Sequence, residues 1–358
     1  MRHPYQDLPA ASFWRRAVAD VPAEVVDPVV AGKFRINAGD RVATAGSCFA
    51  QHISRHLSRA GFNPFVTETV HPVVSRHAAE YGYGLFTARY GNLYTARQLL
   101  QLLKRAYGHF MPLDDIWHGK DGRFIDPFRP QIQPGGFASR SEFMADRRQH
   151  FAAVREAVET LDVLIFTLGL TEAWMAQADG AVYPICPGVS GGDFDTAAHA
   201  FINFGVSDVM ADLSASVAFV RARNPRARFV FTVSPVPLIA TMEPRSVVAS
   251  TTYSKSVLRV AAEEVAQEHE YVAYFPSYEI ITGLHTRGAY FAEDLRSVTE
   301  GGVAHVMRLF LQHYTSAHDP ARQHVVTGRV ADSLVERHFE TMRDTVKIIC
   351  DEELLDQD

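Results

Sequence analysis

The stretch RVATAGSCFAQHISRHLSRAGF, residues 41–62, contains the pattern that decides the fold. Residues 41–45 form a short run typical of a strand, and Gly46 ends that run. Apolar residues then recur at helical spacing until the stop signal at Gly61: Phe49, Ile53 and Leu57. The stretch therefore predicts a strand, a tight turn and a helix.

Three more short apolar runs have the character of buried parallel strands, and an amphipathic helical pattern precedes each of them. The strands are expected at residues 161–169, 227–235 and 270–279, and the helices at 141–160, 206–223 and 254–269. Further helical patterns cover residues 95–107 and 299–314. This alternation indicates right-handed βαβ crossovers and a parallel sheet covered on both faces. We expect an α/β fold with three layers, α/β/α, around a sheet of about five strands.

The remaining segments have a different character. Residues 1–38 are interrupted by proline and predict an N-terminal arm, whereas residues 316–358 have the pattern of a partly charged helical tail. The domain itself is expected over residues 39–315. At about 150 residues per domain the length would also allow two domains, but the ordered strand pattern favours one.

Composition and charge exclude several classes of protein. The chain has 358 residues, with 35 Lys and Arg against 41 Asp and Glu, which gives a net charge of −6. Such a chain has no overall field to attract nucleic acid or anionic lipid. Its three cysteines (Cys48, Cys186 and Cys350) form no disulfide framework or zinc motif, and no run approaches the length of a membrane span. We expect a cytoplasmic protein with no metal, no cofactor, no nucleic-acid partner and no membrane span.

The turn after the first strand carries two adjacent nucleophiles, Ser47 and Cys48. In an open parallel sheet, ligands bind at the carboxyl ends of the strands, so this position favours a functional site. The start of a helix lowers the pKa of a thiol and stabilises a developing oxyanion. The structural alternative is a serine that caps the helix, followed by a buried cysteine.

Within this stretch, TAGSCFAQHI resembles the name-giving motif of the GSCFA family, a branch of the SGNH/GDSL hydrolase-like superfamily. Other segments resemble the alphaproteobacterial type of that family, in the expected order: YGNLYTARQLLQLLKRAYG, FTLGLTEAW, VYPICPG, FTVSPVPL, TTYSKSVLR, YFPSYEI and EDLRSVTEGGVAHVM. Together they cover most of residues 40–312. The resemblance implies an SGNH-like (flavodoxin-like) domain.

The resemblance also implies roles for particular residues. The superfamily's Gly-Asp-Ser turn falls on residues 46–48, which makes Cys48 the nucleophile, while a shift of one makes it Ser47. The oxyanion glycine maps to Gly91, beside Asn92 as a further donor. The third turn contains Gly169, Thr171, which stands in place of the superfamily's Asn, and Glu172. These three residues and Gly46 are the other positions given binding roles.

The pattern breaks at its last element. The superfamily's Asp-x-x-His falls on residues 294–297, where Asp294 is present but Ser297 replaces the histidine. Serine cannot take the proton of a nucleophile as imidazole does. Another histidine could supply the base, and the candidates are His71, His199, His285 and His305. Three arginines are candidates for binding a substrate carboxylate or phosphate: Arg89, Arg97 and Arg129.

These residues lead to two hypotheses. The first is an acyl-ester hydrolase or O-acyltransferase that acts on a carbohydrate or other hydroxyl acceptor through a covalent acyl-enzyme. The second is a catalytically silent module that binds a saccharide or a partner protein in the same cleft. The ordered motifs favour an enzyme, and the absent histidine favours the silent module. The acyl group, the acceptor and the oligomeric state stay open.

Overall fold

A computed structural model of the chain describes residues 3–29, 32–47, 49–59, 62, 65–71, 76–316 and 351–356. Cys48 and Cys350 lie outside the described residues, as does most of the expected C-terminal tail.

The core of the molecule is a parallel sheet of four strands in the order β1-β4-β8-β9. Their bounds are Val42–Gly46, Val163–Leu168, Arg228–Val233 and Val272–Tyr274. Each pair is in parallel register, for example Ala45 with Phe166 and Phe166 with Phe231. The expected α/β class and three layers are confirmed, with four strands instead of about five.

The outer edge of β1 explains the smaller sheet. The backbone N–H of Thr44 donates to the hydroxyl of Thr87 at 3.0 Å, and the Tyr90 hydroxyl donates to the carbonyl of Thr44. An irregular segment around Thr87 therefore covers this edge and satisfies its backbone groups, as natural sheets require of exposed edges. Among the described residues no fifth strand pairs there.

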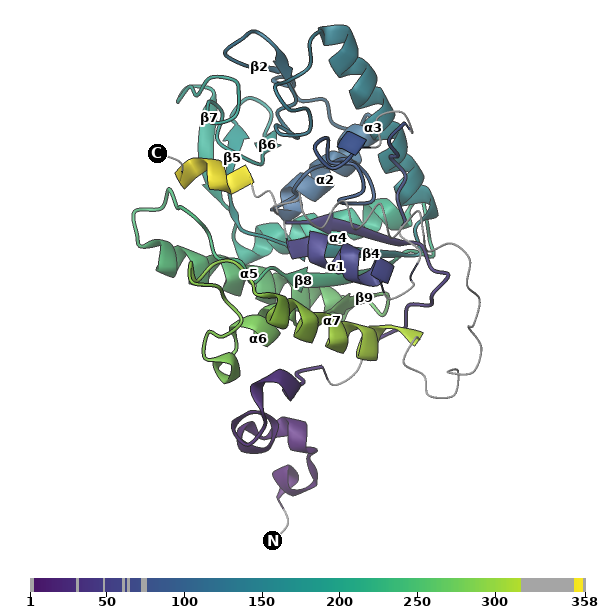
Figure 1. The fold of residues 1–358 in the computed structure, drawn as a ribbon, viewed down its shortest axis with the longest axis vertical. Coiled ribbons are helices and arrows are strands. Elements are labelled where there is room, and N and C mark those ends of the chain that lie inside the picture. The colour runs from purple at the N-terminus through teal and green to yellow at the C-terminus, as the bar shows by residue number, and fades with distance from the viewer. Residues whose placement is uncertain are drawn as a thin grey trace.

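Helices cover both faces of the sheet (Figure 1). Alternate strand residues face opposite cores, so that Leu164 and Phe166 lie in one hydrophobic cluster and Val163 and Ile165 in the other. The first cluster includes residues of α2 (Ala96–Ala106), α3 (Arg140–Thr160), α4 (Val206–Arg221) and α5 (Val247–Glu268). The second includes residues of α1 (Phe49–Arg59), α6 (Ser277–Thr282) and α7 (Glu300–Tyr314).

Two small antiparallel sheets follow none of the sequence patterns. One has the order β6-β5-β7, with bounds Val182–Tyr183, Glu172–Ala176 and His199–Asn203. The other pairs β2 (Trp117–His118) with β3 (Phe124–Ile125). A short 3₁₀ helix, η9 (Asp351–Asp356), packs through Leu354 against a hydrophobic cluster that includes Tyr183 of β6. Figure 1 shows this last helix beside β5, in yellow.

The N-terminal segment forms only short helical turns, η1 to η4, and none of the residues in these turns is buried (Pro4–Asp7, Ala10–Ser12, Arg15–Ala19 and Ala23–Val25). The chain joins the body at Val26, whose carbonyl lies 3.0 Å from Nε2 of His305. Ile36 then forms a β-bridge with Thr315. No helix in the described part of the chain is long and apolar enough to cross a membrane.

Candidate functional site

The turn after β1 is fixed by its close approach to β4. Gly46 has a φ of +136°, and a Cβ at this position would lie 2.3 Å from the carbonyl oxygen of Thr167. The N–H of Ser47 donates to the same carbonyl at 3.1 Å, while the N–H of Ala50 donates to the carbonyl of Ser47 at 2.9 Å. The backbone therefore turns directly from the strand into α1, and only glycine fits at its tightest point.

The hydroxyl of Ser47 is buried at the start of this helix. Ser47 is only 2 % exposed, and its Oγ has no hydrogen-bond partner among the described residues. Leaving a buried hydroxyl unpaired costs about 1–3 kcal/mol, and such groups in native structures often mark a functional site. The position and isolation of this hydroxyl suit a nucleophile.

A small cavity of about 10 Å³ adjoins Ser47 at the carboxyl ends of the strands. Its lining comes from the ends of three strands, from the segment before α2, from α5 and from the loop before α7, and it includes Ser47, Tyr94, Gly169, Ser234, Lys255 and Arg296. This is the edge at which open parallel sheets bind their ligands. No histidine within the described ranges lines the cavity.

Lys255 of α5 is the main feature of the cavity that the sequence reasoning missed. It is 1 % exposed, and its Nζ donates to the carbonyl of Gly169 at 2.5 Å. Gly169 in turn packs against Ser47, because a Cβ on Gly169 would lie 3.1 Å from the Cβ of Ser47. The available signal was a lysine on the buried face of a helix, at helical spacing from the buried Leu258 and Ala262.

Asp294 and Ser297 lie in an exposed turn and contact each other. The Ser297 hydroxyl donates to Asp294 Oδ2 at 2.5 Å, and Oδ1 accepts from the N–H groups of Arg296 and Ser297. These hydrogen bonds lower the pKa of Asp294 below its usual value, and the bond from the Ser297 hydroxyl has the largest effect. Neither side chain lines the cavity beside Ser47, whereas Arg296 between them does.

Gly91 and Asn92 line a second, larger cavity of about 60 Å³. The N–H of the following residue, Leu93, donates to the carbonyl of Gly46 at 2.9 Å, which holds this segment beside the Ser47 turn. Asn92 Nδ2 donates to a carboxylate oxygen of Asp351 at 3.1 Å. The structure thus brings Gly91 and Asn92 close to the turn at Ser47.

Thr171 and Glu172 line neither cavity. The Thr171 hydroxyl donates to Asn203 Oδ1 at 2.7 Å, across the β5–β7 pair. Glu172 is the first residue of β5, and the Thr241 hydroxyl donates to its carboxylate at 2.7 Å. Partial burial raises the pKa of Glu172. The Thr171 side chain thus contacts β7, and the Glu172 side chain joins β5 to the loop before α5.

None of the candidate histidines lines either cavity (His71, His199, His285 and His305). His305 is buried, with Nδ1 2.8 Å from the Tyr290 hydroxyl and Nε2 3.0 Å from the carbonyl of Val26. Burial lowers the pKa of His305. The histidine missing at position 297 is therefore not replaced by another candidate at this edge.

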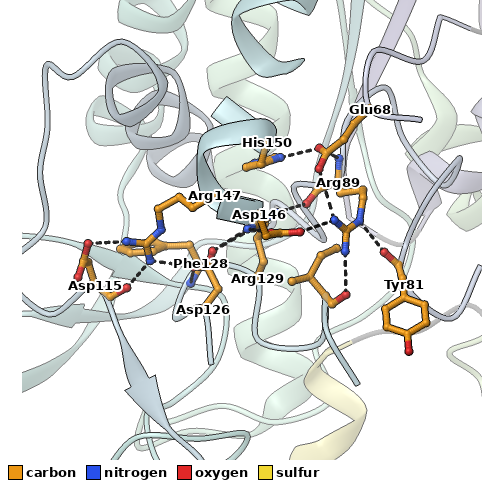
Figure 2. A network of polar contacts seen from close by, with 11 residues as sticks. Glu68, Tyr81, Arg89, Asp115, Asp126, Phe128, Arg129, Asp146, Arg147 and His150 are labelled. Carbon is orange, nitrogen blue, oxygen red and sulfur yellow. Dashed lines mark hydrogen bonds and ion pairs between the residues drawn. The ribbon is translucent and has the colours of Figure 1, made fainter. Parts of the chain in front are cut away.

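The three candidate arginines form ion pairs within the fold. Arg89 and Arg129 share Asp146, at 2.6 and 2.7 Å, in a buried network (Figure 2). Arg97 pairs with Asp212 at 2.7 Å. All three guanidinium groups thus have carboxylate partners inside the protein.

The same network contains the pair of Glu68 and His150, whose Nδ1 lies 2.8 Å from the carboxylate (Figure 2). Burial alone would raise the pKa of Glu68, but the hydrogen bond from His150 and the charge of Arg129 outweigh it and lower the pKa to about 2. Burial lowers the pKa of His150 to about 4. The network therefore joins the irregular segment beside β1, which contains Glu68 and Arg89, to α3, which contains Asp146 and His150. The charge of each group in it affects the pKa of its neighbours.

Replacing Arg129 with Met is expected to lower the free energy of unfolding by about 3–5 kcal/mol, because it removes the nearest ion-pair partner of the buried Asp126, at 3.0 Å. Chemical denaturation monitored by circular dichroism measures the change. The matched control is Arg123→Met, which removes an exposed arginine paired with Asp121 at 3.5 Å and should cost less than about 1 kcal/mol. Equal losses in the two variants would show that the network does not stabilise the fold.

The model of the GSCFA family matches residues 41–310, which include the Ser47 turn, Gly91 and Asn92, Lys255 and most of α7. No curated protein matches the chain at the threshold applied.

Proposed function

The chain belongs to the GSCFA family, and on that premise we propose that it is an acyl-ester hydrolase or O-acyltransferase. It would act on a carbohydrate or another hydroxyl acceptor through a covalent acyl-enzyme. The observation that carries this proposal is the buried Ser47 hydroxyl, without a hydrogen-bond partner among the described residues, at the start of α1. A nucleophile at this end of a helix faces the positive end of its dipole.

In the proposed reaction, the oxygen of Ser47 or the sulfur of Cys48 attacks the acyl carbonyl carbon. The nucleophile's proton passes to a neutral base, the bond to the leaving oxygen breaks, and the base returns the proton to that oxygen. Water or an acceptor hydroxyl then attacks the acyl-enzyme by the same route, which releases the acid or the new ester. Both half-reactions balance without a further reactant.

We assign the base to Lys255 instead of to a histidine. Lys255 lines the Ser47 cavity, and its hydrogen bond to Gly169 orients the amine. Serine–lysine pairs carry out the same acyl transfer as serine–histidine pairs. This assignment would allow catalysis with serine at position 297.

We assign the oxyanion site to Gly91 and Asn92. The N–H groups of Gly169 and Leu170 both donate to the carbonyl of Tyr94, at 2.9 and 3.1 Å, and the N–H of Ser47 donates to Thr167. These backbone donors are therefore engaged in the fold. The side-chain amide of Asn92 lines the larger cavity and donates to Asp351, a partner that it would exchange for the oxyanion. Gly169 supports the site by packing between Ser47 and Lys255.

The proposal is tested by comparing p-nitrophenyl acetate with an acetyl thioester as substrates of the wild type, Ser47→Ala and Cys48→Ala. The variant that removes the nucleophile should lose at least about 10³-fold in kcat/KM, and the other variant should lose less. Preference for the thioester would favour Cys48. If the double variant turns over both substrates as fast as the wild type, nucleophilic catalysis at this turn is wrong.

A second function is favoured by the hydrogen bonding within residues 294–297. Asp294 and Ser297 satisfy each other in an exposed turn, so neither is presented to the nucleophile. This arrangement supports a catalytically silent module that binds a saccharide or a partner protein. Saturable saccharide binding, together with no turnover of any acyl ester, would favour that function over catalysis.

A further inference from the structure

The C-terminal helix η9 docks beside the larger cavity and places the carboxyl group of Asp351 in it. Asp351 is only 5 % exposed. Its Oδ2 accepts from Asn92 Nδ2 at 3.1 Å and from the Tyr94 hydroxyl at 3.3 Å. The same hydroxyl accepts from the N–H of Asp351 at 2.9 Å. One oxygen thus sits on two side-chain donors, next to the proposed nucleophile turn.

The donors at this position are neutral, which determines the kind of group that fits. Burial raises the pKa of Asp351 to about 6, and the hydrogen bonds from Asn92 and Tyr94 offset only part of that effect. A raised carboxyl pKa means that the site holds the neutral acid better than the carboxylate. Two neutral donors that converge on one oxygen suit the carbonyl oxygen of an ester or acid.

The cavity also offers an acceptor for a ligand. Gln51 lines it and is 2 % exposed, and its Oε1 has no hydrogen-bond partner among the described residues. A buried amide oxygen in this state can accept from a ligand hydroxyl. The cavity thus combines the Asn92 amide, a donor for a carbonyl oxygen, with an acceptor for a hydroxyl, as an ester of a polyol requires.

Two contacts hold the rest of η9 over this site. Glu353 lies 3.7 Å from Arg296, which also lines the Ser47 cavity. Leu354 packs against the hydrophobic cluster that includes Trp117 and Tyr183. The segment therefore spans from the loop before α7 to the small sheet, across the mouth of the proposed site.

We propose that Asn92 and Tyr94 form a subsite for the carbonyl oxygen of an acyl substrate, and that Asp351 occupies this subsite as an intramolecular competitor. The C-terminal segment then has to leave before substrate binds. This inference rests on the proposed function, because the reaction that the C-terminal segment would control is the proposed acyl transfer.

Ionisation of Asp351 gives the competition a pH dependence. The Tyr94 hydroxyl donates to Asp351, and two further titratable or charged groups, Glu80 and Arg129, line the same cavity. Arg296 pairs with Glu353 of the same C-terminal helix. The docked pKa of about 6 exceeds the ordinary value of 3.8, so docking is strongest at low pH and weakens as the pH rises to about 6. The difference of about two units corresponds to about a 100-fold weaker docking above pH 6.

Two replacements of Asp351 are expected to have opposite effects. Asp351→Asn keeps an acceptor oxygen but removes the cost of ionisation, so it should dock up to about 100-fold more tightly at pH 7.5. Asp351→Ala removes the acceptor and should dock less tightly. The rate of labelling by a fluorophosphonate probe should therefore rise in Asp351→Ala and fall in Asp351→Asn. Glu264→Gln, at an exposed position of α5, is the control and should match the wild type.

A binding measurement tests the subsite without any chemistry. A fluorescent hexapeptide of the sequence DEELLD, added in trans, should bind Asp351→Ala at least about tenfold more tightly than Asp351→Asn, because the tethered segment competes at high effective concentration. Equal peptide binding by the two variants, or labelling rates that change in the same direction, would overturn the proposal. If no protein is labelled but the peptide binds as expected, the proposed reaction fails while the subsite stands.

Discussion

Lys255→Met is expected to lower kcat/KM for acyl-ester hydrolysis by about 10²–10⁴-fold, the usual contribution of a general base. The side chain that is lost lines the Ser47 cavity and is held by the carbonyl of Gly169. Methionine is similar in length and apolar, so the buried position stays filled. Steady-state kinetics with p-nitrophenyl acetate measure the loss, and circular dichroism shows whether the variant is folded.

Lys255→Arg separates proton transfer from charge. Arginine keeps a positive charge at the cavity but stays protonated in proteins, so it cannot act as a base. If Lys255 accepts the proton, the arginine variant should be as slow as the methionine variant. Activity close to that of the wild type in Lys255→Arg would instead show that the lysine acts only through its charge.

Gly46→Ala is expected to have the largest effect on stability. The new Cβ would lie 2.3 Å from the Thr167 carbonyl oxygen and 2.7 Å from its nitrogen, both of them backbone atoms of the neighbouring strand. The φ of +136° is also strained for any residue with a side chain. Both effects act where β1 is paired with β4, so we expect a loss of more than about 4 kcal/mol, or no folded protein.

Gly39→Ala is the matched control for that variant. No atom lies within 4 Å of a Cβ built on Gly39, and the residue is exposed. Thermal unfolding of the two variants should show a large loss for position 46 and almost none for position 39. A Gly46→Ala protein that melts with the wild type would contradict the close packing of β1 against β4.

The local parts of the fold were predictable from the sequence. The strand before Gly46 and the helical spacing of Phe49, Ile53 and Leu57 predict β1 and α1, because both depend on residues that are neighbours along the chain. The start of α5 was predicted too late, at residue 254. The helix begins at Val247, where the Ser246 hydroxyl accepts from the N–H of Val248.

The three-stranded sheet β6-β5-β7 was not predicted, because its strands show only a weak alternation of apolar and polar residues. Strand β6 has only two residues, and β5 contains Glu172 and a half-buried Trp174 without clear alternation. Its stability comes from pairing with His199–Asn203, which lies far along the chain. Such pairing leaves little trace in a local sequence pattern.

The composition of the site was partly predictable. The turn at Ser47 was singled out at the end of the first strand, and Gly91 and Asn92 were singled out through the family resemblance. Lys255 and Asp351 were not singled out, because each reaches the site through tertiary packing: Lys255 contacts Gly169 from another helix, and Asp351 contacts Asn92 from the far end of the sequence. Asp294 and Ser297 were placed in the site by the motif, but a local hydrogen bond joins them in an exposed turn.

The nucleophile turn is the central claim, and covalent labelling followed by peptide mapping tests it most directly. The wild type is treated with a fluorophosphonate and, separately, with iodoacetamide, and the adducts are located by mass spectrometry. Burial raises the pKa of Cys186 to about 11, so that thiol should react slowly in the folded protein. The account predicts an adduct on Ser47 or Cys48 that is lost in Ser47→Ala or Cys48→Ala. The absence of any adduct at this turn, under conditions that fully label a serine esterase and a cysteine-dependent acyltransferase, would contradict it.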